Sequence, residues 1–95
     1  MYSIKELTEI VNEIVPGHPV KKVVLVGSYA RETATEDSDV DLVLDAENIA
    51  DTFWDILFLL EDRLTIPVDM MTMRGLEDSV LKESVMEGVV TLYER

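Results

Sequence analysis

The sequence predicts an α/β sandwich with a small mixed β-sheet of about four strands flanked by helices. Segments with helical periodicity alternate with short apolar runs along the 95 residues, in the order α-β-α-β-α-β-α-β. Hydrophobic residues make up 47% of the chain, which is enough for a packed core, and there are no cysteines for disulfides or zinc–thiolate sites. Because no repeat, linker or low-complexity stretch divides the chain, we expect a single domain over residues 1–95.

The first half of the chain is predicted to form a helix, a strand, a short helix and a second strand. Residues 3–6 read Ser-Ile-Lys-Glu, a capping-box pattern that begins an amphipathic helix, and Pro16-Gly17 ends it after about Val15. A strand over 21–26, one or two helical turns over 28–32 and a polar loop over 33–38 follow. In the next strand, 39–44, alternation divides the side chains between two faces. Val40, Leu42 and Leu44 face the core, and Asp39, Asp41 and Val43 lie on the other face.

The second half is predicted to contain two helices and two strands. A long helix over 49–64 has Asn48 as its N-cap, and a third strand covers 66–72. A helix over 76–87 is closed by Gly88 at its C′ position, and 89–93 forms a terminal edge strand.

The long helix is unusually apolar. Its core stripe consists of Phe53, Ile56, Leu57, Leu60 and Leu64. Trp54, Phe58 and Leu59 fall partly outside this stripe. We expect them to be buried within the fold, and a docking surface for another protein is the alternative.

Two short motifs carry the chemistry. Gly27-Ser28 closes an apolar strand and opens a short helix, where backbone N–H groups and a hydroxyl can meet a phosphate. Ten residues later, Asp39-Val40-Asp41 places two carboxylates on one side of a strand, where they repel each other. Mg²⁺ relieves such repulsion and prefers oxygen ligands together with substrate phosphates. The combination predicts phosphoryl or nucleotidyl transfer.

Further site residues can be assigned around these motifs. Asp69 is the best candidate for a third carboxylate, because an aspartate within an apolar strand is costly unless it binds something. Asp45 is the rival, although a turn aspartate at a strand end needs no other explanation. Ser28 is expected both to cap the short helix and to bind phosphate. Arg31 either grips a phosphate or pairs with local acids such as Glu32 or Asp37.

The residues from Gly27-Ser28-Tyr29-Ala30-Arg31 through Ser38-Asp39-Val40-Asp41-Leu42 resemble the signature of the minimal nucleotidyltransferase (MNT) domain. This is the smallest branch of the DNA polymerase beta-like nucleotidyltransferases, and the similarity covers nearly the whole chain. It implies the polymerase beta-like fold, with Asp39 and Asp41 holding one or two Mg²⁺ ions. It also favours Asp69 as third ligand or general base. One departure is Glu32, where relatives commonly carry glycine, and we expect it to alter the loop rather than the metal site.

The net charge of the protein limits the kinds of partner that it can bind. Twenty acidic residues against eight basic ones give a formal net charge of −12, and the basic side chains are scattered. Nucleic-acid binding depends on neutralising phosphates with Lys and Arg, so this surface should repel DNA and RNA and favour a basic protein. No apolar run is long enough to span a membrane and the N-terminus is charged, so we expect a cytoplasmic protein.

The resemblance implies an antitoxin that neutralises a HEPN-domain ribonuclease toxin. In the MNT family, AMP is transferred from ATP, with Mg²⁺, to a tyrosine of the toxin. The short chain and its acidity agree with a basic protein acceptor that supplies much of its own positioning. Two alternatives remain: a small-molecule nucleotidyltransferase of the aminoglycoside-modifying kind, and a non-enzymatic antitoxin that acts by sequestration.

Overall fold

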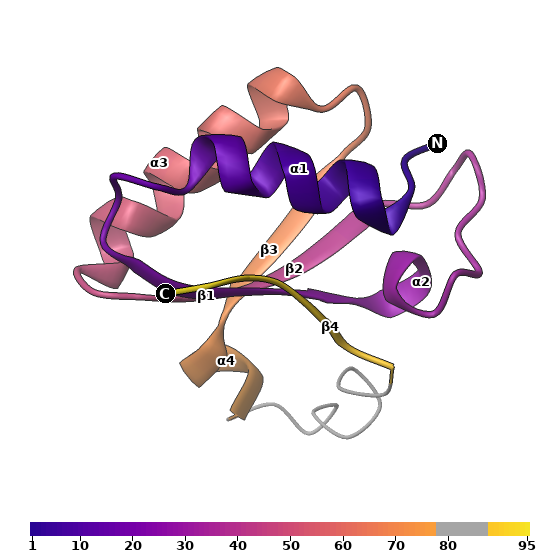
Figure 1. Cartoon of the computed structure of the whole chain (residues 1–95). Coiled ribbons are helices and arrows are strands. Elements are labelled where there is room, and N and C mark those ends of the chain that lie inside the picture. The colour runs from indigo at the N-terminus through magenta and orange to yellow at the C-terminus, as the bar shows by residue number, and fades with distance from the viewer. Residues whose placement is uncertain (78–87) are drawn as a thin grey trace.

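A computed structural model describes residues 1–77 and 88–95. Its four-stranded sheet has the order β3-β2-β1-β4 (Figure 1). β1 (Val20–Val26) pairs antiparallel with both β2 (Val40–Ala46) and β4 (Val90–Glu94), and β2 pairs parallel with β3 (Val68–Thr72). The predicted mixed sheet of about four strands is therefore confirmed, and the last strand lies at an edge as expected.

The helices divide between the two faces of the sheet. In Figure 1, α1 (Ile4–Ile14) and α3 (Ile49–Arg63) cover one face, α4 (Met73–Glu77) lies on the other, and α2 (Gly27–Ala30) follows the end of β1. The expected helix over 76–87 lies almost entirely outside the described residues. The structure also confirms the prediction for the first helix, because Ser3 and Glu6 form the reciprocal capping box at its start.

Alternation along the strands builds one core on each face. The larger core lies under α1 and α3 and includes Val40, Leu42 and Leu44 of β2, as predicted. The face assigned to Asp39, Asp41 and Val43 is not simply exposed to solvent, because a second core forms there. It contains Val24, Val26, Val43 and Leu76. The second core matters for function because it makes the surroundings of the aspartates partly apolar.

One prediction about helix capping was wrong, and another was correct in position only. The residue at the N-cap of α2 is Val26, without a side-chain capping bond, and Ser28 lies within the helix. Asn48 occupies the N-cap position of α3, but its backbone is left-handed (φ 49°) and its side chain makes no capping bond.

β3 starts later than expected. Pro67 has no N–H to donate and contributes only its carbonyl, which accepts from Val40 N.

The prediction for the long helix was only partly correct. Ile56, Leu60 and Leu64 are buried, and Phe53 and Leu57 pack against the larger core. The expected burial of the remaining apolar residues was wrong, since Trp54 is 54% exposed, Phe58 62% and Leu59 42%. The side of α3 that faces the sheet already fills the larger core. Trp54, Phe58 and Leu59 lie on the side that faces away from it, so the core has no room for them. Among the described residues, no helix has the length and apolar character needed to cross a membrane.

Candidate active site

Asp41 and Asp69 are direct neighbours on adjacent parallel strands. The register pairs Asp41 of β2 with Asp69 of β3. In-register neighbours point to the same face of a sheet, with backbones about 4.8 Å apart. This is the face of the smaller core, against which Met71 packs two residues beyond Asp69. Asp39 lies one residue before β2, near enough for its charge to act on Asp41. Three carboxylates proposed from the sequence are thus brought to one region.

Gly27 supports this cluster through its backbone. It has a positive φ of 74°, and a Cβ atom added there would clash with Oδ2 of Asp41. Val26 is the antiparallel partner of Asp41, so the chain turns into α2 directly beside that carboxylate. Only glycine combines this backbone conformation with so close an approach. Gly27 therefore brings the backbone at the start of α2 close to Asp41, the candidate metal ligand. A phosphate bound there could contact both the backbone and a metal ion held by Asp41.

Asp41 is the electrostatic centre of the cluster. Partial burial raises the pKa of its carboxyl, the charges of Asp69 and Asp39 raise it further, and Arg31 opposes them. Desolvation and like charges both disfavour the ionised form, whereas a nearby cation favours it. A divalent cation on the exposed side of Asp41 would offset the repulsion that the charges of Asp69 and Asp39 exert on its ionised carboxylate.

Arg31 lies near enough to Asp41 for its charge to lower the pKa of that carboxyl. Among the described residues, no ion pair joins Arg31 to Glu32 or Asp37, the local partners considered from the sequence. Its side chain instead passes Gly88, where an added Cβ would lie 3.1 Å from Cγ of Arg31. Nothing in the sequence predicts this contact, because it joins the end of α2 to the residues before β4. Arg31 is exposed, so its guanidinium remains accessible to an anionic ligand.

Asp45 does not belong to the cluster. It shares a face with Asp41 but lies four residues further along β2, about 13 Å away at the rise of a strand. Its register partner is Lys22, which also forms a 3.4 Å ion pair with Glu94. The rival candidate for the third carboxylate therefore lies at the opposite end of the strand.

The donor set suits a hard divalent cation. Mg²⁺ favours carboxylate oxygens, waters and substrate phosphates, and the site offers three carboxylates with the backbone of Gly27 alongside. Within residues 1–77 and 88–95, no three His, Cys, Asp or Glu side chains converge as a closed metal centre. Asp39 and Asp69 are exposed, so their side chains can turn toward Asp41 without repacking the core. The residues therefore fit Mg²⁺ after side-chain rotation.

A separate hollow lies on the other face of the sheet. It has a volume of about 200 Å³ and is lined by residues 1–4 together with Tyr29, Glu32 and Ala34. Tyr29 belongs to the larger core, and its buried hydroxyl has no hydrogen-bond partner among the described residues. Because the carboxylates are on the opposite face, we do not assign this hollow to the active site.

Comparison with known proteins identifies the family. A family described as the nucleotidyltransferase domain matches residues 4–91. The chain belongs to this family, and it is a nucleotidyltransferase. Among its relatives, a Methanocaldococcus jannaschii protein provisionally named a protein adenylyltransferase is 32% identical, with coverage of 95% of this chain and 98% of its own. Protein adenylyltransferase MntA of Thermococcus cleftensis is 35% identical over 72 residues, covering 74% of this chain and 73% of its own.

Solved structures confirm the fold. A toxin–antitoxin crystal structure with AMP-PNP contains a chain with a TM-score of 0.63 and 23% identity, covering 99% of this nucleotidyltransferase and 75% of that chain. A structure from Sulfolobus solfataricus, provisionally named a nucleotidyltransferase, gives a TM-score of 0.57 at 23% identity and covers 97% of this chain and 80% of its own. At this level of identity the likeness concerns the fold.

Proposed function

We propose that this nucleotidyltransferase transfers AMP from ATP to a hydroxyl of a partner protein and neutralises that partner as its antitoxin. The observation that carries the proposal is the in-register pair Asp41–Asp69 beside the backbone of Gly27. A phosphate bound at the start of α2 would lie next to carboxylates able to hold the cation that accompanies ATP. Both relatives are named protein adenylyltransferases, the Methanocaldococcus jannaschii protein provisionally, and these names support a protein as acceptor.

Each residue of the site has a role in this reaction. Gly27 and Ser28 would contact the triphosphate through backbone N–H groups and the Ser28 hydroxyl, and Arg31 would add a positive charge beside it. Asp39 and Asp41 would hold Mg²⁺, with Asp69 as a third ligand. When bound, the ion supplies charge neutralisation on the triphosphate.

The transfer itself is a substitution at the α-phosphorus of ATP. The acceptor oxygen forms a bond to that phosphorus, the bond to the bridging oxygen breaks, and pyrophosphate leaves. The proton of the acceptor hydroxyl passes to a base, and Asp69 is the candidate, because it is exposed at the margin of the cluster where an acceptor can approach.

The proposed partner is a basic HEPN-type toxin, and the acceptor is a tyrosine of that toxin in the cytoplasm. The net charge of −12 favours a cationic protein. Similarity in fold to chains of toxin–antitoxin complexes, one of them with AMP-PNP, agrees with this assignment. The HEPN class and the tyrosine come from the resemblance of the Gly-Ser and Asp-x-Asp motifs to the MNT domain.

Mass spectrometry of the partner tests the proposal. The protein encoded by the adjoining gene, expected to be small, helical and to carry an Arg-x4-His motif, should gain AMP when mixed with this enzyme, ATP and Mg²⁺. Asp39→Asn and Asp41→Asn should each abolish the gain, because either change removes a proposed metal ligand. An unmodified partner that is nevertheless silenced would show that sequestration alone neutralises it.

A further inference from the structure

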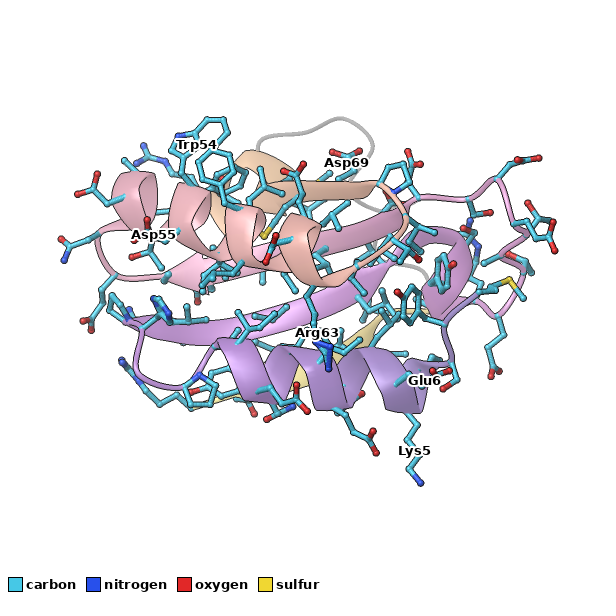
Figure 2. The ribbon with its side chains drawn as sticks, turned by 90° about the horizontal axis from the view of Figure 1, so that it is seen from above. Lys5, Glu6, Trp54, Asp55, Arg63 and Asp69 are labelled. Atoms are coloured by element: carbon cyan, nitrogen blue, oxygen red, sulfur yellow. The ribbon has the colours of Figure 1, made fainter. Side chains whose placement is uncertain are left out.

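The outward side of α3 carries a group of exposed apolar side chains. Trp54, Phe58 and Leu59 form this aromatic patch, and they are 54%, 62% and 42% exposed. Trp54 points away from the body of the protein in Figure 2. Isolated exposed apolar residues are common, but three together on one side of a helix indicate an interaction surface. Ile56 and Leu60 already fill the core side of α3, so the patch contributes little to the packing of this chain.

The aromatic rings of the patch are held in place before any partner arrives. The ring of Trp54 lies 5.8 Å from that of Phe58 and 5.4 Å from that of Phe53, centroid to centroid, with an edge-on arrangement to Phe53. Phe53 in turn packs against the larger core. A large aromatic side chain fixed in this way loses little conformational entropy on binding, which is typical of the residues that dominate protein interfaces.

Acidic residues surround the patch. Side chains four residues apart lie one above another on a helix, so Trp54, Phe58 and Asp62 form one row and Asp51, Asp55 and Leu59 the next. All four carboxylates of α3 (Asp51, Asp55, Glu61 and Asp62) are exposed. Its basic residue, Arg63, forms a 3.0 Å ion pair with Glu13 of α1. This surface therefore has an apolar centre and an acidic rim.

This charge selects the kind of partner. A second copy of the chain would bring the same acidic rim against itself, and each copy carries a net charge of −12. RNA and anionic membranes would also be repelled. We infer that the aromatic patch is the docking surface for a cationic protein that presents apolar side chains flanked by Lys or Arg, and that this protein is the acceptor of AMP. The inference rests on the proposed function for the identity of the acceptor.

The aromatic patch on α3 and the carboxylate cluster are different places on the protein. In the view of Figure 2, Trp54 and Asp69 lie along one margin of the protein, Lys5 and Glu6 lie at the opposite one, and Arg63 lies between them. The patch shares no residue with the cluster of Asp39, Asp41 and Asp69. α3 covers the face of the larger core and Asp69 lies on the other face, so a partner held on α3 would reach around the edge strand β3 to bring its hydroxyl near Asp69. Docking there would raise the effective concentration of the hydroxyl without relying on contacts to the carboxylates.

Binding of a defined protein tests this surface. The probe is the purified product of the adjoining gene, titrated against the intact chain by calorimetry at physiological ionic strength. Trp54→Ser combined with Phe58→Ser should raise Kd at least about 30-fold, because buried aromatic anchors dominate interface energies. The exposed apolar Val89, before the opposite edge strand β4, provides the control: Val89→Ser should leave Kd within about twofold. Circular dichroism and thermal unfolding establish that each variant folds.

Comparison of docking with transfer separates the two proposals. Asp39→Asn should bind like the wild type while transferring no AMP. Patch-dependent binding without AMP transfer by the wild type would leave the docking surface standing and contradict the proposed enzymatic function. Equal binding by the wild type and the patch variant, no binding of the probe to the wild type, or a concentration-dependent dimer abolished by the patch variant would each overturn the docking surface.

Discussion

Asp41 combines roles in stability and in the proposed chemistry, and they oppose each other. Partial burial and the adjacent charges of Asp69 and Asp39 raise the pKa of its carboxyl. In the absence of a cation, an ionised carboxylate there destabilises the fold. The same crowding makes the site attractive to Mg²⁺, because the cation converts repulsion into attraction.

Asp41→Asn should stabilise the metal-free protein at neutral pH. Because its pKa is higher in the native state than in the unfolded chain, the native state binds this proton more tightly. Its contribution to stability is full below the unfolded pKa, about 3.9, and is lost as pH rises through the raised native pKa. The advantage of asparagine should therefore be present at pH 7 and fade below about pH 4. Urea unfolding across pH checks this, with Asp37→Asn in the exposed loop as the charge control; an advantage independent of pH would contradict it.

Asp69→Asn and Asp45→Asn should have opposite outcomes in AMP transfer. Asp69 is the register partner of Asp41, whereas Asp45 pairs with Lys22 at the far end of β2. Loss of a general base costs about 10²- to 10⁴-fold in rate, so Asp69→Asn should lose at least about 100-fold and Asp45→Asn less than about twofold. Initial rates at saturating ATP and Mg²⁺ measure both. If Asp45→Asn were the inactive variant, the third carboxylate would be wrongly assigned.

At the scale of elements, the turn between β1 and β2 controls the site. Gly27 and Glu32 both have left-handed backbones, on either side of Ala30 and Arg31. Gly27 permits contact with Asp41, while Glu32 adopts at φ 58° a conformation that suits glycine better. A glycine at position 32 would adopt this conformation without strain.

Gly27→Ala should damage the site more than Gly17→Ala, although both glycines have positive φ. An added Cβ at Gly17 meets nothing within 4 Å, whereas at Gly27 it meets the carboxylate of Asp41. Strain alone should cost each variant about 1–2 kcal/mol in the free energy of unfolding. Only Gly27→Ala should also lose AMP transfer, by at least about tenfold, because Asp41 must move. Unfolding and transfer assays on the same preparations compare them; equal activity would remove Gly27 from the site.

Glu32→Gly should stabilise the protein slightly. Relief of the left-handed strain returns about 1–2 kcal/mol, and the greater entropy of glycine in the unfolded chain removes about 0.5–1 kcal/mol. A net gain of up to about 1.5 kcal/mol should follow. Glu36→Gly removes the same charge from the same loop without relieving a positive φ, so it should destabilise. Thermal unfolding decides between them, and a loss of stability in Glu32→Gly would refute the account of strain.

At the scale of the whole molecule, we expect the net charge to govern association. The excess of acidic residues extends over the chain, and the ion pairs among residues 1–77 and 88–95 lie at the surface, at 3.0 to 3.4 Å. Exposed pairs of this kind add little to stability. The larger effect of the net charge of −12 is a long-range field that attracts cationic proteins and repels phosphate backbones.

Association with the basic partner should slow as salt rises, while RNA should not bind. Attraction between exposed charges is screened over about 8 Å at physiological ionic strength, so the association rate constant should fall with added NaCl and the dissociation rate constant should change less. Stopped-flow fluorescence of Trp54 offers a direct readout, because this exposed residue belongs to the proposed docking surface. Micromolar or tighter RNA binding by this chain in a gel shift would overturn the assignment to a protein partner.

The sequence by itself determined the alternating elements, the two faces of β2, the Gly-Ser turn and the pair Asp39–Asp41, because these depend on periodicity and local backbone preference. Only the tertiary structure placed Asp69 beside Asp41 and Asp45 far from both, since strand register depends on contacts between segments distant along the chain. It also decided the exposure of Trp54 and Phe58. Hydrophobicity predicts that a side chain favours burial, but whether a helix face is covered depends on the space that its neighbours leave, and here α1 and the sheet had already closed the core from the other side.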